Sequence, residues 1–392
     1  MISDINKLKD KIIYGDSLEI LKKLPSESID CVVTSPPYWN LRDYSTARWI
    51  EGDPNCDHVK NSKATKVFGN PEFNKGRPSR EETKTADYYY KDVCEKCGAI
   101  KEDKQLGQEQ TIQEYIDNLC NIFDEVKRVL KKRGTCWVNL GDTYSSISGG
   151  MSKGYYGKNP ALGDVVKQPK TELPDKCLCQ IPSRFAIEMT NRGWTLRNEI
   201  VWQKSNQMPQ SVKDRFTVDF EKVFFFVKNR NYHFNQILEE ATGYDGRKDL
   251  DYHGGNKDIA LGKHKRWRKY GEVKDGVAGT GLRVHKGFVN HSGYSNIENP
   301  FVRNKRCVWT IPTKSFKEAH FATYPEALIE PMIQAGCPEE GIVLDPFMGS
   351  GTTGLVAKKQ NKYYIGIDLN PEYIKIAKKR IKSYVINNNK LF

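Results

Sequence analysis

Four consecutive residues, Ser35, Pro36, Pro37 and Tyr38 (the diproline corner), combine groups that could hold a small planar ligand. They follow the short β-branched run 29–33, which predicts a buried strand that the prolines end. Each proline fixes its own φ and restricts the residue before it, so we expect the carbonyls of Ser35 and Pro36 to face outward. Such a corner suits a flat heterocycle with an exocyclic amine, which donates to the oxygens while Tyr38 stacks on its ring. The alternative is a turn that only caps the strand, with its aromatic side chains packed at the rim.

A glycine-rich turn nearer the C-terminus is the second candidate. The apolar run 341–344 predicts a buried strand that ends at Asp345, and the turn after it leads into a helix. Turns of this kind let the backbone approach a ligand closely and direct helix N-terminal N–H groups at it. The glycine spacing matches neither the dinucleotide fingerprint nor the phosphate loop with its lysine, so no nucleoside triphosphate site is predicted. The next strand, 363–367, ends at Asp368, a carboxylate placed to accept both hydroxyls of a ribose.

A third acidic residue, Asp16, lies in a predicted β-α-β unit. The unit consists of strand 11–14, helix 18–24 and strand 29–34, and its crossover implies that the two strands are parallel. Asp16 then lies at the carboxyl end of a strand, where open α/β sheets bind ligands. The same residue is equally suited to a simple helix N-cap.

The remaining elements supply the frame that must position these residues. Apolar side chains recur at three- and four-residue steps after Thr111, which predicts an amphipathic helix whose last turn, 131–133, precedes Gly134. We expect the two late strands, 195–203 and 222–228, to form a hairpin at one edge of the sheet. The other predicted elements are the strand 135–140 and the helices 181–192, 324–336 and 372–384.

The segment 45–107 is polar and lacks periodicity, which predicts an insert without a core of its own. Cys94 and Cys97 form a CxxC followed by glycine, the usual knuckle for tetrahedral zinc, and Cys56 with His58 could complete a Cys3His set. Such a metal would supply the folding energy that a polar segment lacks. Free surface thiols or a redox pair are the alternatives. The ten cysteines come without a secretory signal, which argues against a disulfide framework.

The chain of 392 residues carries a formal charge of +13, which points to a polyanionic partner. More than half of this excess lies in 229–319, a segment without helical or strand periodicity. Within it Arg266, Trp267, Arg268 and Lys269 interleave cations with an aromatic ring, which suits loops that reach phosphates and base edges. A solvated basic surface is the alternative. No apolar run approaches membrane-spanning length and no signal peptide is recognisable, so we expect no membrane partner and a cytoplasmic protein.

Together, TSPPYW at 34–39 and DPFMGSGTT at 345–353 resemble the motifs of the DNA amino-methyltransferases, which move a methyl group from S-adenosylmethionine to an exocyclic base nitrogen. The motif order is similar to the beta class of that family. The resemblance implies an α/β, Rossmann-like methyltransferase fold with a mixed, mostly parallel sheet and a circularly permuted motif order. The strand ending at Asp368 would then neighbour the strand ending at Asp16. The implied parts are a catalytic domain (1–44, 108–228 and 320–392), a small zinc-ribbon-like insert (45–107) and a basic target-recognition region (229–319).

The resemblance also implies roles for single positions. The diproline corner would be catalytic, Asp368 would take the ribose of the cofactor, and Asp16 its adenine amine. Phe347, Gly349 and Gly351 would hold its methionine end. The full set of cofactor-binding residues implied in this way is Asp16, Thr34, His320, Asp345, Pro346, Phe347, Gly349, Ser350, Gly351, Thr352 and Asp368.

A target base inside duplex DNA is inaccessible, so the implied reaction requires that the base be flipped out. Acceptors at Ser35 and the Pro36 carbonyl would favour a pyramidal amine nitrogen in line with the sulfonium methyl, and positioning and fixed dipoles would supply the rate. Ser35, in place of Asp or Asn, resembles the cytosine-N4 members more than the adenine-N6 members. An adenine-N6 enzyme, an RNA methyltransferase and a non-catalytic DNA-binding module are the alternatives.

The cysteine contexts argue against a different methylation chemistry. None of the ten cysteines follows a proline in the way expected of a carbon-5 methyltransferase. Double-stranded DNA is the implied substrate, and a cognate restriction endonuclease is a candidate partner. The sequence does not decide between a monomer and a dimer.

Overall fold

The chain forms two compact units, Met1–Asn235 with Cys307–Phe392, and Gln236–Arg306. The computed structural model describes residues 4–39, 46, 48–57, 94, 96–102, 105–145, 171–240, 302–314 and 323–389. The helices of the first unit are η1 (Ile5–Leu8, a 3-10 helix), α1 (Ser17–Leu21), α2 (Ile112–Val129), α3 (Ile181–Asn191), α7 (Glu326–Gly336), α8 (Thr352–Lys359) and α9 (Pro371–Asn389). Its strands are β1 (Lys11–Tyr14), β2 (Ile29–Thr34), β3 (Arg48–Ile50), β4 (Ile100–Glu102), β5 (Leu130–Leu140), β6 (Thr195–Gln203), β7 (Phe220–Val227), β10 (Val308–Thr310), β11 (Ile342–Asp345) and β12 (Tyr363–Asp368).

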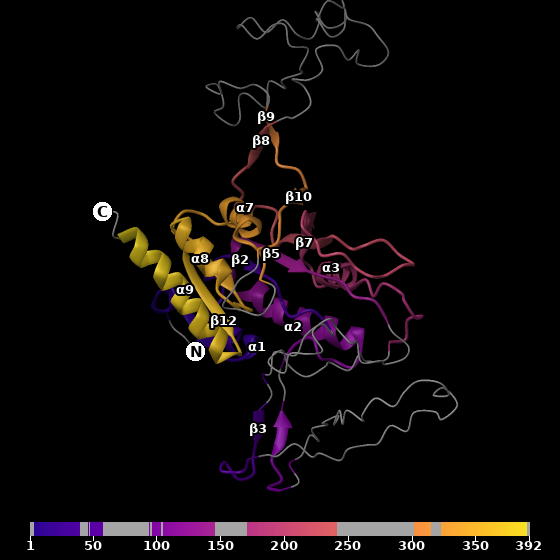
Figure 1. Cartoon of the computed structure of the whole chain (residues 1–392). Helices are drawn as coiled ribbons and strands as arrows, with labels where there is room; N and C mark the ends of the chain where they lie inside the picture. Colours follow the sequence, from indigo (N-terminus) through magenta and orange to yellow (C-terminus); the bar gives the residue numbers. More distant parts are fainter. Residues whose placement is uncertain are drawn as a thin grey trace, which may run out of the picture. The chain divides into compact units, whose positions relative to one another are not determined.

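Eight strands of the first unit form one sheet in the order β1-β12-β11-β2-β5-β7-β6-β10 (Figure 1). Neighbouring strands run parallel except at β7, which is antiparallel to both β5 and β6. The strands β2, β11 and β12 are almost entirely buried, as expected for parallel strands that are covered on both faces. Tyr14 at the end of β1 pairs with Asp368 at the end of β12, so these two strands are neighbours as expected. The carboxyl ends of β1, β12, β11 and β2 therefore meet at one edge of the sheet.

The helices cover the sheet in two layers. In one layer α1 packs on α2 and α2 on α3, and in the other α7 packs on α8 and α8 on α9 (Figure 1). Side chains of β5 alternate between the layers, since Cys136 and Val138 belong to the core around α2 whereas Trp137 lies against Gly336 of α7. Each face of the central strands is thus shielded from water by helices.

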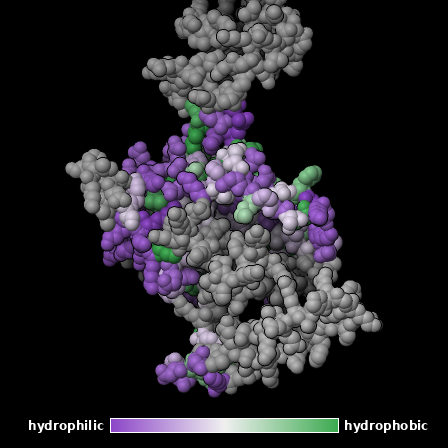
Figure 2. Space-filling model, viewed as in Figure 1, coloured by the Kyte–Doolittle hydropathy of each residue, from purple (hydrophilic) through white to green (hydrophobic). Residues whose placement is uncertain are grey.

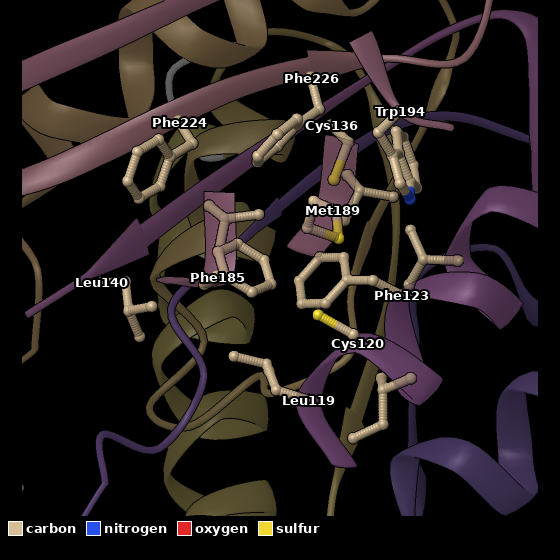
Figure 3. Packing of buried hydrophobic residues seen from close by; sticks show 14 of the residues in the cluster. Leu119, Cys120, Phe123, Cys136, Leu140, Phe185, Met189, Trp194, Phe224 and Phe226 are labelled. Atoms are coloured by element: carbon tan, nitrogen blue, oxygen red, sulfur yellow. The ribbon is translucent and has the colours of Figure 1, made fainter. Parts of the chain in front are cut away.

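The core between the sheet and helices α2 and α3 is dominated by aromatic rings (Figure 3). Phe123 of α2 and Phe185 of α3 pack edge to face with ring centroids 5.2 Å apart. Phe226 of β7 lies 5.9 Å from Phe185 at an interplanar angle of 89°. All three side chains are fully buried, and such burial stabilises the fold by about 1.5–3 kcal/mol for each residue. This packing fixes β5 and β7, whose other ends carry polar residues of the site.

The structure corrects the predicted end of the long helix. The helix begins at a capping box in which Thr111 and Glu114 bond each other's backbone N–H, but α2 ends at Val129. Residues 131–133, predicted as its last turn, belong to β5. The reason is tertiary, because Leu130 is extended and pairs with Ile29 of β2, which overrides the local helical preference.

Two further predictions need adjustment. The helix predicted over 18–24 ends at Leu21, where α1 stops. The strands predicted over 195–203 and 222–228 pair antiparallel as expected, but they do not form the edge of the sheet. The short strand β10 pairs with β6 on its outer side, which the sequence did not predict.

Two smaller sheets lie outside the main one. Within the insert, β3 and β4 pair antiparallel, with Arg48 opposite Glu102. In the second unit, β8 (Leu238–Glu240) and β9 (Val302–Asn304) pair antiparallel. There Glu239 accepts hydrogen bonds from Arg303 over 3.0 Å and Arg306 over 2.9 Å.

The described surface is mostly polar on the face that Figure 2 shows, where hydrophobic residues are scattered and do not form one patch. Among the described helices, none combines the length and the apolar composition that crossing a bilayer requires.

Candidate active site

A buried carboxylate, Asp345, joins the diproline corner to the glycine-rich turn. It ends β11, exposes none of its side chain and accepts four hydrogen bonds. Thr34 at the end of β2 donates its hydroxyl to Oδ1 over 2.6 Å, and the backbone N–H of Phe347 donates to the same oxygen over 3.0 Å. Oδ2 accepts from the Thr353 hydroxyl over 2.6 Å and the Tyr324 hydroxyl over 2.9 Å. The two segments are therefore held together at the carboxyl ends of adjacent parallel strands.

The diproline corner is fixed from α2 and β5. Pro36 is buried, and Ser35, Pro37 and Tyr38 are half-buried. The Tyr115 hydroxyl of α2 donates to the carbonyl of Pro37 over 2.9 Å, so the protein itself uses this acceptor. The ring of Tyr38 lies against the backbone just after β5, where a Cβ on Gly141 would be 2.5 Å from the ring. A larger residue at that position would displace the tyrosine.

The hydroxyl of Tyr38 is hydrogen-bonded to an ion pair formed by Glu221 of β7 and Lys204, the residue after β6. It lies 2.7 Å from Glu221 Oε2 and 3.1 Å from Asn139 Oδ1, and because it has a single hydrogen it donates to the nearer carboxylate. Ser35 Oγ donates to the tyrosine oxygen over 3.3 Å. Lys204 Nζ bonds the other oxygen of Glu221, and the side chains of this pair are only 16% and 15% exposed. The corner's aromatic ring and serine thus share one hydrogen-bonded network with a shielded carboxylate.

The glycine-rich turn presents alternate residues to the outside. Phe347 and Gly349 are half-buried, whereas Pro346, Met348 and Ser350 are buried. The φ of Gly349 is +50°, a conformation that side chains disfavour, and a Cβ there would meet almost nothing. The turn therefore combines an open face with a backbone that can approach a ligand closely.

Asp368, at the end of β12, accepts a hydrogen bond from the backbone of the glycine-rich turn. Its carboxylate accepts from the backbone N–H of Gly349 over 2.7 Å and from that of Asn370 over 2.8 Å. Burial raises the pKa of Asp368 to about 6, although these two donors favour the charged form. Burial also raises the pKa of Asp345, against the effect of its four donors. Two carboxylates with raised pKa values thus lie at the ends of neighbouring strands.

Asp16 has the structural role that the sequence left open. It is the N-cap of α1, and its carboxylate accepts from the backbone N–H of Glu19 over 2.9 Å. The next residue, Ser17, donates its hydroxyl to the carbonyl of Pro346 over 2.5 Å. This buried bond ties the start of α1 to the glycine-rich turn and places Asp16 beside it.

Two hydroxyls of the predicted cofactor set face α9. The guanidinium of Arg380 bonds Thr352 Oγ1 over 2.9 Å and Ser350 Oγ over 3.4 Å, and it also pairs with Glu326 over 3.1 Å. Gly351 lies against the same helix, because a Cβ there would be 2.7 Å from that of Ala377. In this structure Ser350, Gly351 and Thr352 contact α9 and support the glycine-rich turn on the side opposite its open face.

The insert brings three of its predicted metal ligands together. The sulfur atoms of Cys56, Cys94 and Cys97 all lie within 4.8 Å of one another. A backbone hydrogen bond from Ala99 lowers the pKa of the Cys97 thiol, and further hydrogen bonds to the sulfur act in the same direction. Such a donor set suits a thiophilic metal ion such as zinc.

The structure gathers most of the predicted site residues at one edge of the sheet. Those following β1, β2, β11 and β12 lie together there, namely Asp16, Thr34, the diproline corner, Asp345 to Thr352 and Asp368. The predicted residues that lie outside the described part of the chain are His58, Arg266, Trp267, Arg268, Lys269 and His320. A cavity of about 580 Å³ beside Arg133 and Tyr232 lies at the opposite end of β5 and β7, away from this edge.

Sequence reasoning missed several residues of the site. Asn139, Lys204 and Glu221 meet at Tyr38 only because β5, β6 and β7 pair in a particular register. A signal was available, since polar or charged side chains interrupt apolar strands at Asn139 and Glu221. Tyr324, noted only as a helix start, is a partner of Asp345.

The arrangement suits transfer between a nucleoside-containing ligand and a planar amine. Carboxylates at Asp16 and Asp368 can accept from amine and hydroxyl groups, and the open turn at Gly349 can approach the rest of that ligand. The diproline corner, on the neighbouring strand, offers a hydroxyl and an aromatic ring to a second molecule.

A family comparison agrees with this arrangement. Residues 29–379 match the N6/N4 methyltransferase family model, which is described as DNA methylase. The chain belongs to this family. The methylase is 33% identical over 375 residues to the Type II methyltransferase M.Cfr9I of Citrobacter freundii, covering 95% of this chain and 87% of that protein. It is 30% identical over 372 residues to M.SmaI of Serratia marcescens, covering 95% and 90% of the two chains.

Solved structures are similar to the methylase over most of its length. The PvuII DNA methyltransferase, described as cytosine-N4-specific, covers 94% of this chain and 84% of its own, with 16% identity and a TM-score of 0.49. A putative DNA modification methylase from Thermus thermophilus, complexed with S-adenosyl-L-methionine, covers 95% and 92% with 16% identity and a TM-score of 0.46. Neither likeness bears on which base this methylase modifies.

The carboxylate of Asp345 should be essential for stability. In Asp345→Asn the side chain keeps only one acceptor oxygen, so two of the four hydrogen bonds lose their acceptor, and we expect the free energy of unfolding to fall by about 1–3 kcal/mol. Urea denaturation followed by circular dichroism measures the change. Asp16→Asn is the matched control, because asparagine caps a helix as well as aspartate does. Equal stability of the two variants would contradict the role of the Asp345 network.

Proposed function

We propose that this DNA methylase transfers a methyl group from S-adenosylmethionine to the N4 amine of a cytosine flipped out of duplex DNA. The observation that carries the proposal is the hydrogen bond from Thr34 to Asp345, which places the diproline corner beside the glycine-rich turn. Methyl transfer requires the bound amine and the bound methyl donor to lie close enough for a bond to form between them. Ser35 at the corner favours cytosine over adenine through its resemblance to the cytosine-N4 members.

The cofactor is proposed to occupy the ends of β1, β11 and β12. Asp368 would accept the ribose hydroxyls, Asp16 the adenine amine, and the open face at Phe347 and Gly349 would hold the methionine part. Asp368 is half-buried, which supports this assignment because hydrogen bonds to a carboxylate are stronger where water has reduced access. His320, outside the described residues, is retained as a cofactor contact in the proposal.

Transfer at the corner depends on positioning. Ser35 Oγ and the Pro36 carbonyl would accept the N–H groups of the target amine and so direct the nitrogen lone pair at the methyl group. Tyr38 would stack on the flipped base, and Glu221 would keep its hydroxyl in place. The amine attacks the methyl carbon, the carbon–sulfur bond breaks, and the nitrogen then loses a proton to solvent. Alignment of this kind supplies much of the rate in such reactions.

Recognition of DNA is proposed to involve the basic segment 229–319, including Arg266, Trp267, Arg268 and Lys269. The separate compact unit Gln236–Arg306 and the excess of positive charge support this assignment. Relatives named as Type II methyltransferases support a role in restriction-modification with a cognate endonuclease. The insert is assigned a structural zinc, with His58 proposed as a ligand beside the three cysteines.

Analysis of the methylated nucleoside tests the proposed function. After incubation with duplex DNA and S-adenosylmethionine, mass spectrometry of the digested DNA is expected to show N4-methylcytosine. Ser35→Ala should reduce its formation on the order of 100-fold, whereas the exposed Ser383→Ala on α9 should not. N6-methyladenine as the sole product would overturn the choice of base, and full activity of Ser35→Ala would overturn the role of the corner.

The Glu221 carboxylate is expected to act as a positioning group. Glu221→Gln removes the charge that holds Tyr38 and Lys204, so we expect kcat to fall on the order of 10-fold while the Kd for S-adenosylmethionine stays unchanged. Glu199→Gln, on the neighbouring strand and paired with Lys222, is the matched control. Single-turnover methylation and calorimetry separate the two effects. A loss of cofactor affinity without a change in kcat would contradict this role.

Cofactor binding should depend on pH through Asp368. Its ionised form accepts both ribose hydroxyls, and its pKa is about 6, so affinity is expected to rise with pH up to about that value and then level off. Below it, the protonated carboxyl must lose its proton before it can accept both bonds. Calorimetric titration with S-adenosylmethionine between about pH 5 and 8 measures the effect. Asp368→Asn should bind weakly without this dependence, and an unchanged pH profile in that variant would assign the titration to another group.

A further inference from the structure

The three clustered thiols of the insert have the spacing of a metal site. The Sγ atoms of Cys56 and Cys94 are 3.9 Å apart, and that of Cys97 lies within 4.8 Å of both. Sulfur ligands placed about 2.3 Å from a tetrahedral zinc are about 3.8 Å from one another. A zinc ion at the centre of the cluster therefore needs only small movements of the side chains.

The backbone around the CxxC pair has the form of a metal-binding knuckle. Gly98 has a φ of +74°, which closes the turn after Cys97 and which other residues rarely adopt. The N–H of Gly98 donates to the carbonyl of Cys94 over 2.8 Å, and the N–H of Cys94 donates to the carbonyl of Ala99 over 2.7 Å. The turn thus holds the sulfur atoms of Cys94 and Cys97 close together.

The insert has two arms, one around β3 and one around β4. The contacts that hold these arms together are weak without a metal. Strands β3 and β4 are three residues each, and an isolated hairpin of this size is marginally stable at best. The ion pair of Lys96 with Asp57 has side chains 56% and 62% exposed, and such solvent-exposed pairs contribute little to stability. The arms nevertheless approach closely, since a Cβ on Gly52 would lie 2.8 Å from the backbone of Ala99.

Both ends of the insert are anchored at the diproline corner. On the entering side, the Trp39 indole N–H donates to the carbonyl of Glu109 over 3.0 Å. On the returning side, the N–H of Gly107 donates to the Glu109 carboxylate over 2.8 Å, and a Cβ on Gly107 would be 2.8 Å from the carbonyl of Tyr38. Trp39 and Leu106 are both buried in the main core. Anything that closes the insert therefore also constrains the residues on each side of Tyr38.

We infer that Cys56, Cys94 and Cys97 bind one zinc ion, and that this ion closes the insert and thereby holds the diproline corner in register. Each thiol releases its proton to solvent as it binds, and the metal is not oxidised or reduced. The site is structural, because no carboxylate or histidine among the described residues joins the thiol cluster. The effect on the corner rests on the proposed function, whereas metal binding itself does not.

Metal content tests the site directly. The full-length protein, purified without chelators from zinc-supplemented cells, is expected to contain about one zinc per chain by plasma mass spectrometry. Cys97→Ser should reduce this to below about 0.2 per chain, whereas Cys307→Ser, which removes an exposed thiol elsewhere, should not. Replacing zinc with cobalt(II) in the wild-type protein should give the intense thiolate-to-cobalt absorption of a tetrahedral site, which requires no variant to fold.

A second readout separates the metal from the methylation chemistry. In Cys97→Ser we expect DNA methylation to fall on the order of 100-fold, with the affinity for S-adenosylmethionine unchanged, because the insert is anchored beside the diproline corner whereas the proposed cofactor residues follow β1, β11 and β12. Wild-type protein without zinc, or with its three thiols oxidised, would overturn the inference. Loss of zinc with full methylation would overturn the link to the corner. Bound zinc in a wild-type protein that methylates no DNA would instead reject the proposed function and leave the metal site standing.

Discussion

The hydrogen bond between Thr34 and Asp345 is the constraint on which the rest of the site depends. It joins residues 311 positions apart, and it can form only because β2 and β11 are adjacent parallel strands. Asp345 is fully buried, so an unmet acceptor there would be costly. Four donors from four parts of the chain satisfy it, and each donor fixes the position of its own segment. The corner after β2 and the turn after β11 are consequently set by one carboxylate.

The two sides of the glycine-rich turn have different contacts. The glycine-rich turn has an open front at Gly349, while Arg380 binds its hydroxyls at Ser350 and Thr352 from behind. Functional turns gain precision when their supporting contacts lie on rigid elements, and α9 supplies such support here. The polar contacts that would meet a ligand are thereby separated from those that maintain the turn.

The same separation appears at the diproline corner. Tyr115 fixes the Pro37 carbonyl. Glu221, paired with Lys204, holds the hydroxyl of Tyr38, and the side chains of this ion pair are largely shielded from water. Hydrogen bonds to a charged group are stronger than neutral ones, so this network orients the ring of Tyr38. The insert adds a further constraint through Trp39 and Gly107, since both of its ends return to the corner.

The sequence predicted the two motifs and most of the elements that carry them, and the resemblance to the methyltransferase family implied that β1 and β12 are neighbours. The apolar runs are short and bounded by proline or glycine, so local patterning identifies them, and the order of strands and helices restricts the topology. The end of α2 could not be found in this way. Leu130 leaves the helix to pair with Ile29, and such pairing depends on a strand far away in the sequence. Which side chains meet at the corner depends on strands that pair across long distances in the sequence. Asn139 and Glu221 reach Tyr38 because β5 and β7 pair with Asn139 opposite Val223, and shifting this register by one residue would put the two side chains on opposite faces of the sheet. The thiols show the reverse case, because the local CxxC spacing already predicted that Cys94 and Cys97 lie close together. Local spacing encodes a turn, whereas a network between distant strands exists only once those strands have paired.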